Sequence, residues 1–114
     1  MPIKRGHLYI IDFNPRIKTK PGKLRPALAL QSDLVNDAGY PSTIVIPTTT
    51  RLVENAGILR FRLKKGQGGV ARDSDLLLGQ VIAVANESFR RELGALANPI
   101  LEELENRIRI ILSL

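Results

Sequence analysis

Two side chains at the ends of apolar segments have the chemistry to hold a phosphodiester. Arg25 ends a basic stretch and begins an apolar segment, and Thr49 lies in a run of three threonines that follows another. A guanidinium donates two parallel hydrogen bonds to a phosphate, and a threonine hydroxyl can donate one more. Together they would stabilise negative charge developing on a phosphate. Because Arg and Thr are common at strand ends, their types alone do not single out this chemistry.

Composition excludes most other familiar kinds of active site. The chain has no cysteine, which rules out disulfides, thiolate catalysis and cysteine-based metal or iron–sulfur sites. Its only histidine, His7, cannot form a two-histidine acid–base pair or a polyhistidine metal site. The phosphate-binding, dinucleotide-binding, zinc-protease and serine-hydrolase motifs are absent from the sequence. These absences remove most familiar enzyme classes, and no motif points to a cofactor.

Positive charge is concentrated at the start of the chain. The net charge is +6, from 17 Lys and Arg against 11 Asp and Glu. Residues 1–25 hold seven of the basic side chains and one acid, Asp12, and the rest of the chain is balanced at ten of each sign. Five of the seven lie between Asn14 and Arg25. This cationic segment predicts contact with a polyanion such as nucleic acid. The alternative is a basic surface that only aids solubility.

The elements that would position these side chains are short and mostly β. Apolar or alternating segments predict strands over 7–13, 25–31, 42–47, 58–63 and 76–84, the last interrupted at Gly79 and Gln80. A loop is expected over 33–41, and a short helical or irregular stretch over 87–91. Pro26 should lie at the start or on the edge of its strand, because it cannot donate a ladder hydrogen bond.

A C-terminal helix completes the predicted fold. Asn98 is expected to be its N-cap and Pro99 its first residue. Its apolar stripe, expected to pack on the core, contains Leu101, Leu104, Ile108, Ile111 and Leu112. We predict one mainly β (α+β) domain over residues 1–114, a small, strongly curved β-barrel with a C-terminal α-helix. No apolar run could span a bilayer and no signal peptide is recognised, so a cytoplasmic location is expected.

Five short motifs along the chain match those of one known family. They are Arg5-Gly6-His7-Leu8-Tyr9, Asp12-Phe13-Asn14-Pro15, Leu24-Arg25-Pro26-Ala27-Leu28, the segment 44–50 (IVIPTTT) and Leu77-Leu78-Gly79-Gln80-Val81. In order and spacing the sequence resembles the MazF/PemK toxins of bacterial toxin–antitoxin systems. The resemblance implies an SH3-like barrel and a metal-independent, sequence-selective endoribonuclease that cleaves single-stranded RNA, mRNA included.

The same resemblance implies a mechanism. In this family the 2′-hydroxyl of the RNA attacks the adjacent phosphate, which leaves a 2′,3′-cyclic phosphate and a 5′-hydroxyl. Arg25 and Thr49 occupy the positions of the family's catalytic arginine and threonine. Deprotonating a guanidinium at neutral pH costs about 7 kcal/mol. Arg25 is therefore assigned to binding the phosphate and to proton transfer as an acid, and Thr49 to stabilising the charged transition state.

The other predicted site residues concern RNA binding. Lys20 and Lys23 are expected to contact phosphates rather than read bases, and Thr19 and Thr50 are expected beside them. Gln80 keeps the family's residue, and it is expected either to contact RNA or to form a hydrogen bond inside the barrel. His7 is interpreted as a surface residue at a strand edge.

Several positions depart from the family pattern. Gly79 stands where an acid commonly precedes the glutamine, Ile82 where a basic residue often follows, and His7 in place of an acid; Thr19-Lys20-Pro21 replaces the common Ser-Glu-Gln. These changes predict either a shifted sequence preference or weaker activity. They leave a non-catalytic RNA-binding barrel as an alternative function. A gyrase-poisoning toxin of the same fold is disfavoured because the chain has no tryptophan.

The resemblance also implies partners. We expect a homodimer that binds single-stranded RNA and a small cognate antitoxin, and that binds DNA together with that antitoxin. The basic segment predicts that the antitoxin presents an acidic, partly disordered tail covering the same surface as RNA.

Overall fold

Strand β3 joins the two parts of a sheet that curls around itself. The computed structural model describes residues 1–13 and 23–114. The strands are β1 (His7–Asp12), β2 (Leu24–Ala29), β3 (Ser42–Thr49), β4 (Arg60–Leu63), β5 (Ser74–Leu77), β6 (Ile82–Ala85) and β7 (Phe89–Ala95). The helices are α1 (Asp33–Asp37) and α2 (Asn98–Leu112), with short 3₁₀ turns η1 (Gly57–Leu59), η2 (Gln67–Gly69) and η3 (Asn86–Ser88).

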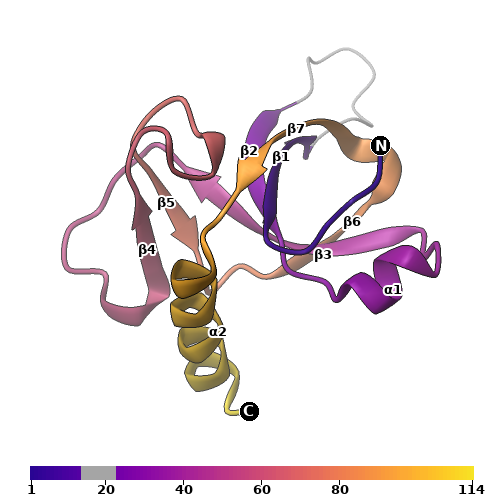
Figure 1. Ribbon diagram of the computed structural model, residues 1–114. Coiled ribbons are helices and arrows are strands. Elements are labelled where there is room, and N and C mark those ends of the chain that lie inside the picture. The colour runs from indigo at the N-terminus through magenta and orange to yellow at the C-terminus, as the bar shows by residue number, and fades with distance from the viewer. Residues whose placement is uncertain (14–22) are drawn as a thin grey trace.

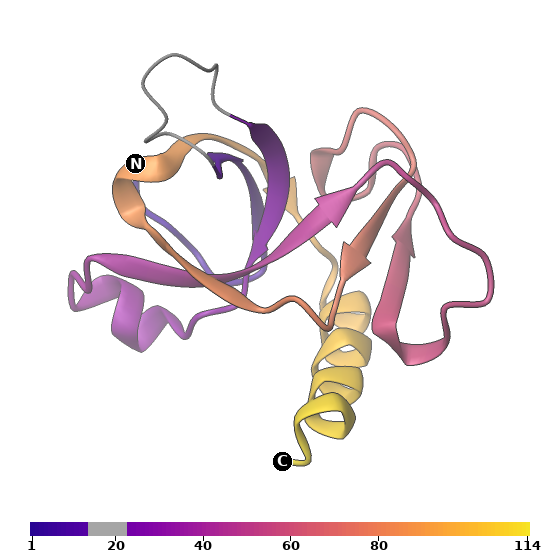
Figure 2. The ribbon, with the colours of Figure 1, turned by 180° about the vertical axis from the view of Figure 1, so that it is seen from behind.

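The antiparallel strands pair in the order β4-β5-β3-β2-β1-β7, and β6 pairs with the first half of β3. β1, β2, β3, β6 and β7 curl into a ring, with the β4–β5 hairpin leaning away from it and α2 below (Figure 1). Seen from behind, β3 runs from the ring to the hairpin (Figure 2). Among the described residues β6 and β7 do not pair with each other, so the ring is not closed by hydrogen bonds. The predicted mainly β fold with a curved, barrel-like sheet and a C-terminal helix is confirmed.

Alternation along β1, β2 and β3 buries both faces of the sheet. On one face Leu8, Leu28 and Ile46 pack in a cluster with Leu104 and Ile108 of α2. This contact uses the apolar stripe predicted for the terminal helix except Leu112, which is exposed, and it fixes α2 across the sheet. Because side chains alternate with a period of two, the intervening residues of the same strands point to the opposite face.

The opposite face lines the inside of the ring. Tyr9, Ile11, Ala27, Val45 and Phe89 form its apolar cluster, and the Tyr9 and Phe89 rings meet edge to face with centroids 5.2 Å apart. Small residues such as Ala27 suit the tight curvature there. Towards the β4–β5 hairpin this same face becomes polar, and it carries the candidate site described below.

Five details differ from the sequence predictions. Residues 58–59 of the predicted strand 58–63 belong to the 3₁₀ turn η1. Residues 33–37 form α1 rather than a loop, since the Ser32 hydroxyl accepts a hydrogen bond from the Leu34 N–H at 3.1 Å and caps the helix. The segment 76–84 forms parts of two strands, β5 and β6, with a turn at Gly79 and Gln80. The stretch 87–91 contains the end of η3 and the start of strand β7. Helix α2 is capped by Ala97 rather than Asn98, without a side-chain bond.

Pro26 lies near the start of an inner strand. Its Cα partner in β1 is Ile10, and the ladder from β2 to β3 begins one residue later, at Ala27. Pro26 therefore lies just beyond the end of the β2–β3 ladder, where its lack of an N–H removes no hydrogen bond from that ladder. There the Thr48 hydroxyl donates a hydrogen bond to the Pro26 carbonyl at 2.8 Å. Strands β2 and β3 thus stay together as far as Arg25 and Thr49.

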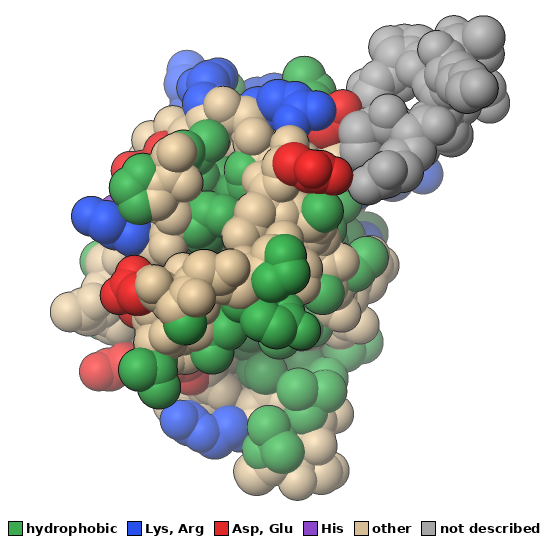
Figure 3. Space-filling model, turned by 90° about the vertical axis from the view of Figure 1, so that its right-hand side faces the viewer, with side chains coloured by type: hydrophobic (Ala, Val, Ile, Leu, Met, Phe, Trp, Pro, Cys, Tyr) green, Lys and Arg blue, Asp and Glu red, His purple; other side chains and the backbone are tan. Residues whose placement is uncertain are grey.

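Apolar side chains also reach the surface. Leu34, Ile44, Ile82, Leu112 and Leu114 are each more than two-fifths exposed. On the side of the molecule seen in Figure 3, apolar side chains gather into a patch with few charges. Patches of this kind are typical of protein–protein contacts. Within the described residues, no helix is both long and apolar enough to cross a membrane.

Candidate functional site

Arg25 and Thr49 lie on neighbouring strands at the same end of the sheet. Ala27 of β2 pairs with Pro47 of β3, and continuing this register by two residues places Arg25 opposite Thr49. Residues opposite each other in a sheet point to the same face. The Arg25 Nη1 also lies 3.5 Å from the Thr48 carbonyl oxygen, at the limit of a hydrogen bond. The fold therefore brings the two candidate catalytic residues together.

A groove with a volume of about 400 Å³ opens beside Arg25. Lys23, Arg25 and Gln80 supply its polar side chains, and its apolar walls are Phe13, Pro47, Val81 and Ile82. We call this the Arg25 groove. Lys23 and Gln80 are exposed and Arg25 is half-buried. No acid among the described residues pairs with Lys23 or Arg25, so the groove is cationic.

Of the other predicted site residues, Gln80 lines this groove, whereas Thr49 and Thr50 do not. Thr49 is half-buried at the end of β3, and its Oγ1 accepts a hydrogen bond from the Arg51 N–H at 3.1 Å. Thr50 follows in an exposed turn. Gln80 faces the groove and solvent rather than the barrel interior. Thr19 and Lys20 lie outside the described residues.

The prediction that His7 is a surface residue at a strand edge is wrong, because β1 lies between β2 and β7 and His7 is half-buried. Its Nδ1 lies 3.3 Å from a carboxylate oxygen of Glu92 on β7. In the described part of the chain no three His, Asp or Glu side chains come together as a set of metal ligands.

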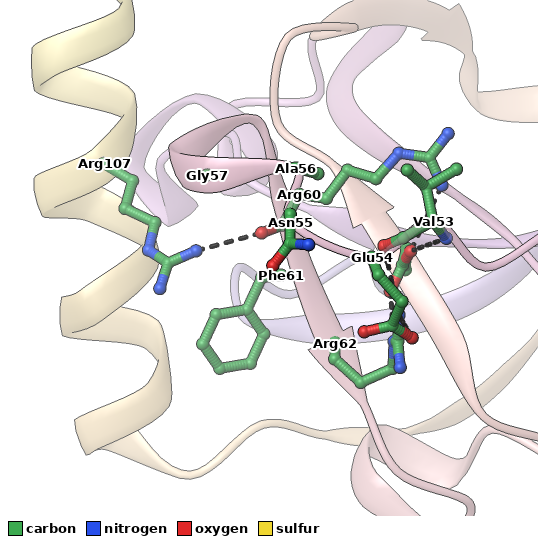
Figure 4. A pocket seen from close by; sticks show the side chains of 10 residues that line it. Val53, Glu54, Asn55, Ala56, Gly57, Arg60, Phe61, Arg62 and Arg107 are labelled. Carbon is green, nitrogen blue, oxygen red and sulfur yellow. Dashed lines mark hydrogen bonds and ion pairs between the residues drawn. The ribbon is translucent and has the colours of Figure 1, made fainter.

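A second group of charged residues continues the same face onto the hairpin. Asp75 of β5 is buried, at 1 % exposure, and pairs in register with Thr49 on one side and Arg62 on the other. Its carboxylate accepts hydrogen bonds from Arg62 Nε at 2.5 Å and from Arg60 Nη1 at 3.1 Å. The Val53 N–H is a third donor, at 3.4 Å. Asp75 and these three donor residues line a pocket with a volume of about 420 Å³. Figure 4 shows Arg60, Arg62 and Val53 on its wall.

We call Asp75, Arg60 and Arg62 the Asp75 cluster. Burial raises the pKa of the Asp75 carboxyl, but hydrogen bonds from Arg62 and Arg60 outweigh this effect, so the pKa lies below its ordinary value. The hydrogen bond from Arg62 to Asp75 in turn raises the pKa of Arg62. The cluster is therefore ionised at neutral pH, with two guanidinium groups sharing one carboxylate.

Helix α2 contacts the wall of this pocket through Arg107. Its guanidinium lies over the Phe61 ring, 5.3 Å from the centroid, and Nη1 donates to the Arg60 carbonyl at 2.9 Å. Glu103 accepts a hydrogen bond from Arg107 Nε at 2.7 Å. The helix is thus attached to β4 by a cation–π contact and a hydrogen bond as well as by its apolar stripe.

The sequence predictions missed the Asp75 cluster. The alternation of Arg60 and Arg62 on one face of a strand was visible, but nothing indicated an acceptor for them. Asp75 directly precedes the predicted strand 76–84, and no role was predicted for it. The signal that could have revealed the cluster is an acidic residue directly before the buried apolar run Leu76–Leu78.

Sequence comparison assigns the family. The sequence model of the family described as the PemK-like, MazF-like toxin of type II toxin–antitoxin systems matches residues 4–112. The chain belongs to this family. The match includes Arg25, Thr49 and Gln80, and it confirms the resemblance found in the motifs.

Curated relatives match over nearly their full length. Endoribonuclease EndoA of Bacillus subtilis is 25 % identical over 115 residues, covering all of this chain and 97 % of the relative. Endoribonuclease MazF of Staphylococcus saprophyticus is 26 % identical over 113 residues, covering 98 % and 92 %.

Solved structures of toxins have the same fold. The MazE–MazF structure (Form-II) from Deinococcus radiodurans superposes with a TM-score of 0.81 at 22 % identity, covering all of this chain and 98 % of that one. The Mycobacterium tuberculosis toxin MazF-mt6 superposes with a TM-score of 0.76 at 18 % identity, covering 95 % and 97 %. At these identities the similarity establishes the fold alone.

Proposed function

We propose that this toxin-family protein is an endoribonuclease that cleaves single-stranded RNA in the Arg25 groove. The observation that carries the proposal is the cationic groove itself, in which Lys23 and Arg25 lie next to the threonine run of β3. Two curated relatives of nearly the same length are named endoribonucleases, which supports the same activity here.

The proposed reaction uses the RNA as its own nucleophile. The ribose 2′-oxygen attacks the adjacent phosphorus as its proton passes to solvent water, and the bond from phosphorus to the 5′-oxygen breaks. That oxygen takes a proton from the Arg25 guanidinium, which regains one from solvent. The products are a 2′,3′-cyclic phosphate and a 5′-hydroxyl. Negative charge accumulates on the phosphate oxygens, and the protein's task is to orient the phosphate and stabilise this charge. No metal is required by this scheme.

Each role follows from the chemistry of the side chain. The planar Arg25 guanidinium binds the scissile phosphate through two hydrogen bonds and can protonate the leaving 5′-oxygen. Thr49 donates its hydroxyl hydrogen to a phosphate oxygen. Its Oγ1 already accepts from the Arg51 N–H, so its own proton is free for the substrate.

The groove also suits the flanking nucleotides. Lys23 is exposed and contacts a neighbouring phosphate, and Gln80 and Thr50 donate to or accept from RNA. Phe13, which is half-buried, offers an apolar wall on which a base can stack. We include Thr19 and Lys20 among the RNA-binding residues on sequence grounds alone. Selectivity for a short base sequence belongs to this proposal, since stacked bases expose their edges to such side chains.

We further propose that the protein acts as a homodimer and is inhibited by a cognate antitoxin with an acidic tail. The related Deinococcus structure contains MazE with MazF. The apolar surface patch is suited to a protein–protein contact. Lys23 and Arg25, which have no acidic partner in the described part of the chain, would attract an acidic tail by the same electrostatics that attracts RNA.

The test is cleavage of a short single-stranded RNA with end-group analysis. Wild type should yield a cyclic phosphate and a 5′-hydroxyl, with equal rates in EDTA and in Mg²⁺. Arg25→Ala should lose cleavage while its melting curve stays that of wild type. Cleavage that EDTA abolishes, or that survives in Arg25→Ala, would contradict the proposed chemistry.

One observation favours a second function. Ile82, which is 48 % exposed, lines the Arg25 groove and offers no charge to a phosphate there. The protein could then bind RNA without cleaving it. In that case wild type and Arg25→Ala would be equally inert, and wild type would retain salt-dependent binding in a filter or anisotropy assay.

A further inference from the structure

The Asp75 cluster and the candidate catalytic pair form one row across the sheet. Arg62 pairs with Asp75, Asp75 pairs with Thr49, and Thr49 lies opposite Arg25 in the extended β2–β3 register. Since opposite residues share a face, all four side chains lie on the same face of the sheet. The contacts that hold the Asp75 side chain therefore lie directly beside Thr49.

The segment from Thr50 to Ala56, which we call loop 50–56, leaves the sheet immediately after Thr49. Its residues Thr50 to Asn55 are all exposed, so burial contributes little to its conformation. Asn55 has a positive φ of 58°, which L-residues adopt only in particular turns. A loop of this kind needs specific polar contacts to hold one conformation.

The Asp75 cluster supplies those contacts through three backbone groups of the loop. Arg60 Nη1 donates to the Arg51 carbonyl at 2.9 Å, and Arg62 Nη2 donates to the Val53 carbonyl at 3.3 Å. The Asp75 carboxylate accepts from the Val53 N–H at 3.4 Å. Figure 4 shows Arg60, Arg62 and Val53 gathered around this point. Because Asp75 fixes both guanidinium groups, it fixes all three contacts.

A continuous chain of hydrogen bonds leads from Asp75 to the Thr49 hydroxyl. Asp75 binds Arg60, Arg60 binds the Arg51 carbonyl, and the Arg51 N–H binds Thr49 Oγ1. The last bond occupies an acceptor site of the hydroxyl and so restricts the directions in which its proton can point. A change of the loop at Arg51 would release the Thr49 side chain to rotate.

We propose that Asp75, acting through Arg60 and Arg62, is a positioning residue that holds loop 50–56 and orients the Thr49 hydroxyl towards the scissile phosphate in the Arg25 groove. This inference rests on the proposed function and adds to it a group that does not touch the substrate. It predicts that the cluster affects the chemical step more than RNA binding, because Lys23 and Arg25 stay in place.

The test compares two variants of the cluster with a matched control. Asp75→Asn keeps the side-chain volume and removes the charge, and Arg60→Gln removes the bond to Arg51 while leaving Asp75 bound to Arg62. We expect kcat to fall by about 10- to 100-fold in both, with KM within about twofold of wild type. Asp73→Asn is the control, because it makes the same charge change two residues away, where Asp73 accepts a hydrogen bond from the Lys65 N–H and has no ion pair within residues 1–13 and 23–114. Its kcat should equal that of wild type.

A second readout follows the loop itself. The chain has no cysteine, so Glu54→Cys carries a single spin label, at a side chain that is 82 % exposed. The label should become more mobile in Asp75→Asn and Arg60→Gln but not in Asp73→Asn. Should Asp75→Asn fail to fold, Arg60→Gln decides the outcome.

Two results would overturn the inference. One is a mobile loop with an unchanged kcat, and the other is a lower kcat with an immobile loop. Wild type that cleaves RNA together with an equally active Asp75→Asn refutes this inference alone. Wild type that cleaves no RNA refutes the proposed function and the inference with it.

Discussion

The Arg25 groove and the Asp75 cluster lie on one face of the same sheet, yet they use arginine in opposite ways. In the groove, Lys23 and Arg25 have no acidic partner among the described residues. In the cluster, Arg60 and Arg62 share the buried Asp75 carboxylate and donate to backbone carbonyls. The positive charge of the groove is therefore available to a ligand, whereas the guanidinium groups of the cluster are bound by other groups of the protein.

The difference teaches where stability and activity should separate. An unpaired, partly exposed guanidinium contributes little to folding, but it binds phosphate strongly. A buried carboxylate with two guanidinium partners cannot lose its charge without leaving those partners unsatisfied. Changes in the groove should therefore affect catalysis alone, whereas changes in the cluster should affect folding as well.

The largest effect is expected for Arg25→Lys. Lysine keeps the positive charge but loses the planar pair of donors that binds two phosphate oxygens. We expect kcat on single-stranded RNA to fall by about 100-fold, the range found when a preorganised donor to a developing oxyanion is removed. The free energy of unfolding, measured in urea, should change by less than about 0.5 kcal/mol. A lysine variant with wild-type kcat would show that charge alone suffices at this position.

The next largest effect is expected on stability, for Asp75→Asn. The variant leaves two guanidinium groups without their shared carboxylate, at a site with 1 % exposure. Arg60 and Arg62 are about a quarter exposed and can regain water, so the cost should be smaller than for a fully buried pair, about 2 kcal/mol. Urea unfolding measures it, with Asp73→Asn as the reference. Equal midpoints for these two variants would show that the cluster does not stabilise the fold.

Local sequence patterns predicted individual strands and the terminal helix, because such patterns depend on residues that are near one another in the chain. The strand leading to Thr49, the strand beginning near Arg25 and helix α2 each show alternation or an apolar stripe. Their juxtaposition came from the resemblance to the toxin family, because register between strands is not encoded locally.

The Asp75 cluster and strand β7 were not predicted, because both depend on pairing between residues that are far apart in the chain. Asp75 lies 15 residues from Arg60 and 13 from Arg62, and only the β4–β5 register brings them together. Strand β7 has a mostly exposed and polar sequence, FRRELGA, and becomes a strand through its pairing with β1. In both cases tertiary contacts outweighed local propensity.

The next effect concerns how the free energy of unfolding depends on pH, which should differ between the Arg25 groove and the Asp75 cluster. The pKa of Asp75 is lower in the folded protein than its ordinary value, because hydrogen bonds from Arg62 and Arg60 outweigh the effect of burial. The folded state therefore binds this proton less readily than the unfolded state does. The resulting stability is present above the ordinary pKa of 3.8 and is lost as the pH falls through the folded value.

Asp75→Asn should flatten this loss without abolishing it. The pKa of Asp33 is also lowered, by a hydrogen bond from the Arg5 N–H, and that contribution remains in the variant. Urea unfolding between pH 6 and pH 2 for both proteins measures the difference. Parallel curves would mean that Asp75 is not held as a carboxylate by its arginines.

A smaller effect is expected for Lys23→Gln, which removes one charge from the Arg25 groove. We expect KM for RNA to rise by about threefold with kcat unchanged, and the slope of log affinity against log salt to fall by about 0.7, the value for one phosphate contact on a single strand. Lys64→Gln removes the same charge from an exposed position on the β4–β5 hairpin and should alter neither quantity. Equal salt slopes for the two variants would exclude Lys23 from the RNA path.

The smallest effect is expected for Glu54→Gln, which tests whether every ion pair near the Asp75 cluster matters. Glu54 Oε1 lies 3.6 Å from Arg62 Nη2, but the side chain is 82 % exposed and Arg62 is already held by Asp75 and the Val53 carbonyl. Solvent screens such a pair, so no measurable change in the urea midpoint is expected. Loop 50–56 should also stay in place, because none of its backbone contacts involves Glu54. A clear loss of stability in Glu54→Gln would mean that Asp75 does not by itself hold Arg62, and the cluster would then include the loop's own acid.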